Sequence, residues 1–187
     1  MSAIVILGHS GSGKTSVGAW IAKHLDMPCI DTDDKVLEHI NKTSIQPEYG
    51  MQRAARYPAS WLSRWSWLEA ESQIIPGLLQ EDNVVIVGGQ TSMPATVKDA
   101  IANVPMSIHC VADETTTLSR IAKCEDHLVR DLDEVQVRSK TASVHRLWVV
   151  LQNRSEQVKE YGQLATHELD TSGDFASAIP RIKALLA

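Results

Sequence analysis

Residues 3–25, AIVILGHSGSGKTSVGAWIAKHL, join an apolar run, a glycine-rich turn and an amphipathic segment. The run at residues 3–7 is apolar throughout, as expected for a strand that is buried on both faces of a parallel sheet. Beyond the glycines, Val17, Ile21 and Leu25 recur at the spacing of one helix face. The stretch therefore predicts a strand, a loop and a helix, the unit that α/β folds repeat.

The glycine-rich turn fits the pattern G-x-x-x-x-G-K-[ST], which ends here in Gly13, Lys14 and Thr15. In such a loop the backbone N–H groups point inward and the next helix adds the positive end of its dipole, so the loop holds phosphate. Lys14 would reach the outer phosphates of a nucleotide, and the Thr15 hydroxyl would bind Mg²⁺. The pattern alone leaves a GTPase, an ATPase and a small-molecule kinase open. His9 is expected to point outward, and the nucleotide is expected to contact Gly8, Ser10, Gly11, Ser12, Gly13, Lys14, Thr15 and Ser16.

A second informative stretch is CIDTDDKVLEHI, residues 29–40, in which a short predicted strand ends in several acids. Ligands of open α/β sheets lie beyond the carboxyl ends of the strands, so these acids are expected beside the phosphates. One carboxylate would hold Mg²⁺ through water, and another, two residues further along an extended chain, could accept a proton from an attacking hydroxyl. We expect Asp31 and Asp33 at the site and Asp34 at a helix cap or in solvent.

The rest of the chain alternates in the same way and predicts an α/β doubly wound fold, a three-layer sandwich with a parallel central sheet. Predicted strands lie at residues 3–7, 27–31, 84–89, 106–111 and 167–170, and predicted helices include 94–102, 114–122, one through Val144 to Val158 and one through Ile179 to Leu186, with Pro180 at its start or at a kink. At 187 residues the chain predicts one domain. Residues 41–59 and 123–133 fit no periodicity, which is common in segments that cover a substrate.

The amino-acid composition argues against several classes of protein. A net charge of -5 disfavours a nucleic-acid partner, which normally needs a basic surface. No run of 18 apolar residues occurs, so no membrane span is expected. Cys29, Cys110 and Cys124 form no C-x-x-C pair and suggest reduced thiols in a cytoplasmic protein.

The motifs together resemble the shikimate kinase family. The glycine loop, the helix VGAWIAKHL and then IDTD at residues 30–33 match that family most specifically. Weaker likeness continues through VVIVGGQTSMPATVKDAI, VPMSIHCVADETTTLSRI and ELDTSGDFASAIPRIKALL, so that it spans nearly the whole chain. The resemblance implies a P-loop kinase that uses ATP and Mg²⁺, with an acceptor-binding insertion at about residues 33–80 and a lid at about 123–133. It also implies a small-molecule acceptor and a monomer or weak dimer.

The resemblance also implies roles for single residues. Asp31 matches the acid that positions Mg²⁺ with Thr15, and Asp33 matches the acid that binds the acceptor hydroxyl and acts as base. Arg120 matches a side chain that lies on the adenine. The acceptor itself would be held by Gly88 and Gly89, which match glycines that face it, and by Arg154, which matches an arginine that grips its carboxylate.

Three departures from the family pattern affect the acceptor side. The aromatic–Arg–x–x–Glu motif falls on Trp65, Ser66 and Glu69, so that its arginine is missing; Arg64 is the neighbouring candidate for substrate binding. The third glycine of the turn after residue 87 is Gln90. The lid has no Arg-Pro-Leu-Leu, which leaves Arg130 as the candidate for a catalytic arginine, although acids surround it. Each lost arginine removes charge-assisted hydrogen bonds to an anionic acceptor or to the transferring phosphoryl group.

Three functions remain open. The first is a kinase that phosphorylates shikimate or a shikimate-like hydroxy acid, with Lys14, Asp33 and Arg130 as catalytic residues. A nucleoside or nucleotide kinase is the second, and a nucleotide-binding regulatory module that has lost phosphoryl transfer is the third. The tryptophans allow two interpretations. In the first, Trp61, Trp65 and Leu68, which have the spacing of one helix face, pack into the core. In the second, Trp65 or Trp67 lines the acceptor pocket.

Overall fold

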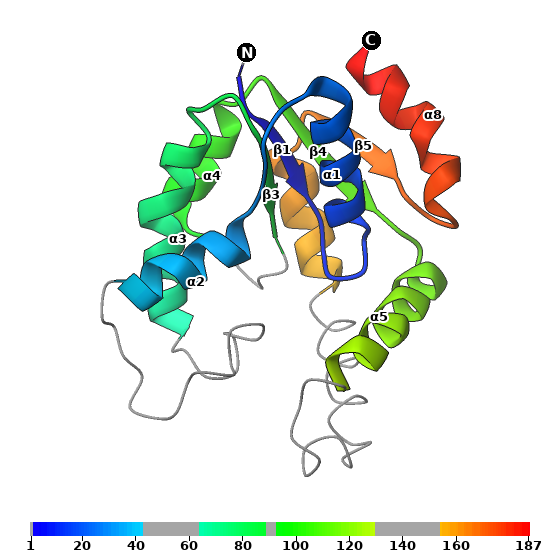
Figure 1. Cartoon of the computed structure of the whole chain (residues 1–187), viewed down its shortest axis with the longest axis horizontal. Helices are drawn as coiled ribbons and strands as arrows, with labels where there is room; N and C mark the ends of the chain where they lie inside the picture. The colour runs from blue at the N-terminus through cyan, green and yellow to red at the C-terminus, as the bar shows by residue number, and fades with distance from the viewer. Residues whose placement is uncertain (1, 43–63, 89–92, 130–153) are drawn as a thin grey trace.

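The computed structural model describes residues 2–42, 64–88, 93–129 and 154–187 (Figure 1). Its centre is a sheet of five parallel strands in the order β2-β3-β1-β4-β5. The strands are β1 (Ile4–Leu7), β2 (Cys29–Asp31), β3 (Val84–Val87), β4 (Met106–Val111) and β5 (His167–Asp170). The predicted fold class and all five predicted strands are confirmed, with ends that shift by a few residues.

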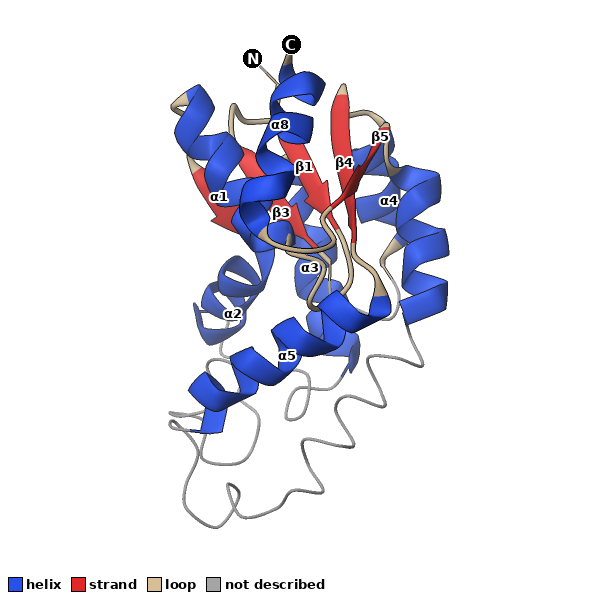
Figure 2. Cartoon of the chain, turned by 90° about the vertical axis from the view of Figure 1, so that its right-hand side faces the viewer, coloured by secondary structure: helices blue, strands red, loops and turns tan. Residues whose placement is uncertain are grey.

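Helices cover both faces of the sheet, as Figures 1 and 2 show. One face packs against α1 (Lys14–Leu25) and α8 (Phe175–Leu186), and the other against α3 (Arg64–Leu78), α4 (Ala95–Ala102) and the helical residues 154–164. Strand β1 is buried on both sides, because Ile4 and Ile6 lie in the first of these cores and Val5 and Leu7 in the second. Burial on both sides explains why the strand is apolar at every position.

Helix α1 approaches the sheet closely where Gly18 faces it. A Cβ atom at Gly18 would lie 2.6 Å from Ile86 of β3, so any larger residue would push the helix away from the strand. The helix starts directly after the glycine loop, with Gly13 at its N-cap. Close packing at Gly18 therefore fixes where the loop sits above the end of the sheet.

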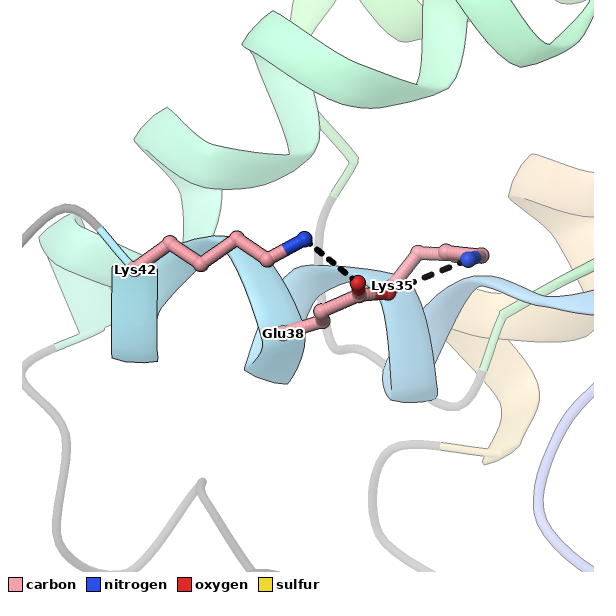
Figure 3. A network of polar contacts seen from close by, with 3 residues as sticks. All are labelled: Lys35, Glu38 and Lys42. Atoms are coloured by element: carbon pink, nitrogen blue, oxygen red, sulfur yellow. Dashed lines mark hydrogen bonds and ion pairs between the residues drawn. The ribbon is translucent and has the colours of Figure 1, made fainter.

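Helix α2 (Thr32–Lys42) follows β2 directly and packs against α3 through Val36, Ile40 and Trp67. Its outer face carries an exposed network in which Glu38 accepts from Lys35 at 3.0 Å and from Lys42 at 2.6 Å (Figure 3). These ion pairs at i,i+3 and i,i+4 hold the solvent side of the helix. The apolar side is left to face α3.

The structure bears on three sequence-based expectations about helices. Residues 123–129 are not irregular, because α5 (Glu114–Val129) continues through them. Pro180 does not mark the start of the last helix, since α8 begins at Phe175 and Pro180 lies inside it; a kink at Pro180 stays a prediction. Leu68 of α3 is half-buried, whereas Trp67 and Ala70 form its buried face. Residues 43–63 and 130–153, with Trp61 and the predicted stripe through Val144, lie outside the described residues.

Within the described part of the chain, no helix has both the length and the apolar character that crossing a membrane requires.

Candidate active site at the carboxyl ends of the strands

At two positions of the loop between β1 and α1, the backbone has a conformation that only glycine adopts easily. Gly11 and Gly13 have φ values of 79° and 83°, in the left-handed region. A Cβ at Gly13 would lie 3.0 Å from the Arg120 guanidinium, and one at Gly11 would lie 3.0 Å from the Thr117 carbonyl oxygen. The loop is thus wound tightly at the N-terminus of α1, where N–H groups and the helix dipole favour an anion.

Two side chains that are distant in the sequence, Arg120 of α5 and Thr171 after β5, donate hydrogen bonds to the backbone of this loop. The Arg120 guanidinium donates to the carbonyl oxygens of Gly11 at 3.2 Å, Thr171 at 2.6 Å and Gly173 at 3.0 Å. The Thr171 hydroxyl donates to the Ser12 carbonyl oxygen at 2.5 Å. These bonds tie the loop to α5 and to the residues after β5. Arg120 therefore has a structural task in the chain, and its predicted contact with adenine stays a prediction.

The polar side chains at the loop fit a phosphate group and a hydrated Mg²⁺ ion. Lys14 is half-buried, and its positive charge acts on Asp31 and Asp33: it lowers their pKa values, whereas desolvation raises them. The hydroxyl-bearing residues Thr15 and Ser16 are exposed in the first turn of α1. An ammonium group and a hydroxyl in the first turn of α1, with two carboxylates on which that ammonium acts, are the groups that phosphates and Mg²⁺ use.

The two acids come from adjacent elements and not from one extended strand. Asp31 ends β2, whereas Asp33 lies in the first turn of α2, which begins at Thr32. Asp31, and not Asp34, stabilises this turn, because its Oδ1 accepts the N–H of Asp33 at 3.1 Å. The expectation of an extended chain here is therefore wrong, although Asp31 lies at the carboxyl end of β2 and Asp33 just beyond it.

The electrostatic surroundings favour a proton acceptor at Asp33. Desolvation by the protein around it, followed by repulsion from Asp31, raises the pKa of Asp33 to about 6, even though solvent still reaches the side chain. Desolvation also raises the pKa of Asp31, against which its hydrogen bond with the Asp33 N–H and the charge of Lys14 act. A carboxylate with a pKa near neutrality is well matched to general base catalysis.

On the acceptor side, Gly88 follows β3 and touches the phosphate loop. Its φ is 125°, and a Cβ there would lie 2.7 Å from the Gly8 carbonyl oxygen. The Arg154 guanidinium donates to the Ala112 carbonyl oxygen at 2.6 Å, and its charge acts on His9. Glu69 is exposed on α3. Gly89, Gln90 and Arg130 lie outside the described residues, as do the side chains of Arg64, Trp65 and Ser66.

Two buried polar residues near this site were not predicted. His9 does not point outward: it is fully buried, its Nδ1 lies 2.8 Å from the Ser10 carbonyl oxygen, and burial lowers its pKa to about 4. Glu71 of α3 is also buried and bonds to the Trp67 indole N–H. The sequence does carry a signal for Glu71, because it falls at i+4 from Trp67 and i+1 from Ala70, within the stripe that α3 buries.

Comparisons of this chain with known proteins find similar sequences among the shikimate kinases. Residues 10–58 match the family model of shikimate kinase. Curated relatives include a shikimate kinase of Caldicellulosiruptor bescii, 34% identical over 100 residues, a match that covers 52% of this chain and 52% of the relative. A shikimate kinase of Mesorhizobium japonicum is 26% identical over 121 residues, which cover 64% of this chain and 54% of the relative. The chain therefore spans about half the length of the curated relatives it matches.

Solved structures extend the likeness to the whole fold. The shikimate kinase of Acinetobacter baumannii in complex with shikimate superposes with a TM-score of 0.66 at 17% identity, over 100% of this chain and 93% of the other. The shikimate kinase of Bacteroides thetaiotaomicron superposes with a TM-score of 0.71 at 15% identity, over 99% and 98%. At these identities the superpositions show a shared fold, and the sequence matches confirm the resemblance to shikimate kinases.

Proposed function

Because the chain is related to the shikimate kinases, we propose that it is an ATP-dependent kinase. It transfers the γ-phosphoryl group to a hydroxyl of a small anionic metabolite, either shikimate or a shikimate-like hydroxy acid. The observation that carries this proposal is the arrangement at the carboxyl ends of the strands: Lys14 starts α1 directly after the glycine loop, and its charge acts on Asp31 at the end of β2 and on Asp33 in the first turn of α2. A pure nucleotide binder has no need for a second acid with a pKa near neutrality at that point.

The roles of the residues follow from their positions. The N–H groups of the loop and the Lys14 ammonium would hold the phosphates of ATP, and the Thr15 hydroxyl and Asp31 would hold Mg²⁺, the acid through water. When bound, Mg²⁺ supplies neutralisation of the charge on the phosphate oxygens. Asp33 would orient the acceptor hydroxyl and take its proton as the oxygen bonds to the γ-phosphorus and ADP leaves with the electrons of the broken P–O bond.

The remaining parts of the proposal concern the whole chain. Residues 1–187 form one P-loop kinase domain, in which α2 and α3 belong to the acceptor-binding insertion at about 33–80. Residues 123–133 form the lid, and its first part is the end of α5. Arg130, Arg154, Arg64, Glu69, Gly88 and Gly89 stay candidates for the acceptor and catalytic groups, and Arg120 for the adenine. A cytoplasmic location and a monomeric or weakly dimeric state complete the proposal.

The test is ADP release by the purified chain with Mg²⁺ and ATP, measured with and without candidate acceptors. A suitable panel contains shikimate, quinate, gluconate and two nucleosides, with the phosphorylated product identified by ³¹P NMR. We expect a hydroxy acid to stimulate ADP release and to carry the phosphate afterwards. ATP binding without stimulation by any acceptor would instead favour the regulatory module, which the absent lid motif and Gln90 also suggest.

A further inference from the structure

The guanidinium of Arg120 joins two segments that are far apart in the sequence. On one side, its Nη1 donates to the Gly11 carbonyl oxygen in the glycine loop at 3.2 Å. On the other side, its Nη2 donates to the carbonyl oxygens of Thr171 and Gly173, at 2.6 Å and 3.0 Å. The two terminal nitrogens of one planar group therefore link the loop after β1 to the residues after β5.

Helix α5 also packs directly against the glycine loop at both of its left-handed glycines. A Cβ atom at Gly13 would lie 3.0 Å from Nη1 and 3.6 Å from Cζ of the half-buried Arg120. A Cβ atom at Gly11 would lie 3.0 Å from the carbonyl oxygen of Thr117. Thr117 and Arg120 are three residues apart in α5 and so share one helix face. That face supports the loop along its length.

The hydrogen bonds fix the orientation of two successive peptide groups in the loop. Arg120 holds the carbonyl oxygen of Gly11. The Thr171 hydroxyl holds the next one, the carbonyl oxygen of Ser12, at 2.5 Å. In a trans peptide the C=O and N–H groups point in opposite directions, so a bond to the Ser12 oxygen turns the Gly13 N–H away from Thr171. The support behind the loop thus determines where its N–H groups point in front.

We propose that Arg120 is a positioning residue for phosphate binding, which acts by holding the glycine loop in the conformation that presents its N–H groups to phosphate oxygens. This inference rests on the nucleotide binding in the proposed function and not on phosphoryl transfer. The role differs from a contact between Arg120 and adenine, because its effect passes through the loop. It therefore extends to any ligand that is bound through phosphate oxygens, with or without a base.

The shape of the guanidinium matters for this role as well as its charge. A guanidinium presents five N–H donors in a rigid fork, so that one side chain spans Gly11 and the segment at residues 171–173. A lysine ammonium keeps the charge but places all its donors on one nitrogen at the end of a flexible stem. Lysine at position 120 therefore cannot hold both segments in the same way.

Three variants separate positioning from the other roles. Arg120→Met keeps an unbranched apolar stem and removes the charge and the donors, and Arg120→Lys keeps the charge. Arg181→Met is the control for loss of a positive charge, because Arg181 is exposed on α8. Circular dichroism and thermal unfolding check folding. Isothermal titration calorimetry, without any acceptor, gives the Kd for ATP and for inorganic tripolyphosphate, which lacks the base, each with Mg²⁺.

We expect Arg120→Met to raise the Kd for ATP and the Kd for tripolyphosphate by the same factor, about tenfold or more, because the charge-assisted bond to the loop is lost and the loop is no longer preorganised. Arg120→Lys should raise both Kd values equally, by about threefold or more, because its ammonium cannot reproduce the fork. Arg181→Met should keep both values within about twofold of the wild-type chain.

Weaker ATP binding with unchanged tripolyphosphate binding would overturn the inference, because Arg120 would then act on the base. Wild-type Kd values for both ligands in folded Arg120→Met, or in Arg120→Lys, would also overturn it, since the bonds would then be purely structural or the charge alone would suffice. If Arg120→Met does not fold, Arg120→Lys decides by the same comparison.

The wild-type chain separates this inference from the proposed function. If it binds both ligands but shows no acceptor-stimulated turnover, the proposed transfer fails and the role of Arg120 is still decided by the Kd values. If it binds ATP but no tripolyphosphate, the loop does not bind phosphate by itself and the inference fails alone. If it binds neither ligand, both fail together.

Discussion

Lys14 is the residue on which the proposed chemistry depends most. It starts α1 directly after the glycine loop, and its charge acts on Asp31 and Asp33 together. The sequence predicts this residue well, because the loop pattern is contiguous and each position has a local physical task. The burial of His9 in the same loop could not be predicted from the sequence, because it depends on how distant segments pack around the loop.

Replacing Lys14 by alanine should abolish turnover while the fold persists, because the side chain is half-buried at the start of α1 and belongs to neither hydrophobic core. We expect acceptor-stimulated ADP release to fall by about 10²-fold or more, as on loss of other groups that stabilise transferring charge. Lys23→Ala, at an exposed position in the last turn of α1, is the matched control and should keep wild-type turnover. Equal turnover in both variants would remove Lys14 from the mechanism.

Glu71 should make the stability of the chain depend on pH. Its pKa is raised from 4.5 to about 7 in the folded state, so the stabilising contribution is complete below pH 4.5 and is lost as the pH rises through 7. The loss is on the order of 3 kcal/mol. Glu71→Gln cannot ionise, so we expect it to raise Tm at pH 8 and to raise it far less at pH 5, measured by thermal unfolding. A Tm change of equal size at both pH values would contradict the raised pKa.

At the scale of elements, the packing of α2 against α3 determines features of the site that the sequence did not predict. Asp33 was expected on an extended chain, but α2 starts one residue after β2, so the acid enters from a helical turn. The buried face of α3 includes Glu71, which a count of apolar positions passes over. The exposed Lys35–Glu38–Lys42 network on α2 (Figure 3) adds little by itself, because solvent and salt screen such pairs.

The contact between β3 and the phosphate loop gives a prediction at this scale. Gly88→Ala places a Cβ at φ 125° and 2.7 Å from the Gly8 carbonyl oxygen, so the loop must shift. We expect a loss of about 1–3 kcal/mol of stability, together with a higher KM for ATP.

Gly77→Ala is the matched control, because Gly77 lies in α3 with no atom within 4 Å of a new Cβ. Alanine favours the helix there by about 0.5–1 kcal/mol, so Tm should rise and the KM for ATP should stay unchanged. Chemical denaturation and steady-state kinetics measure both. A Gly88→Ala protein as stable and as active as Gly77→Ala would show that the loop and β3 do not touch.

For the whole molecule, the sequence predicts the fold class and the order of the strands along the chain, because β1 and β3 are short apolar runs and β4 is a largely apolar one. Their spatial order β2-β3-β1-β4-β5 brings the glycine loop, Asp31 and Gly88 to the same edge of the sheet. Side-chain pairs such as Trp67 with Glu71 and Arg120 with Thr171 were not predictable, since their geometry depends on how the helices and loops pack.

The most direct measurement compares turnover and ATP binding in Asp33→Asn. If Asp33 takes the proton of the acceptor hydroxyl, kcat should fall by about 10²-fold or more, while the Kd for ATP with Mg²⁺ stays near the wild-type value. Asp34→Asn, which changes an exposed acid one residue further on, should keep wild-type kcat. An Asp33→Asn protein that phosphorylates the acceptor at the wild-type rate would contradict the proposed transfer at this site.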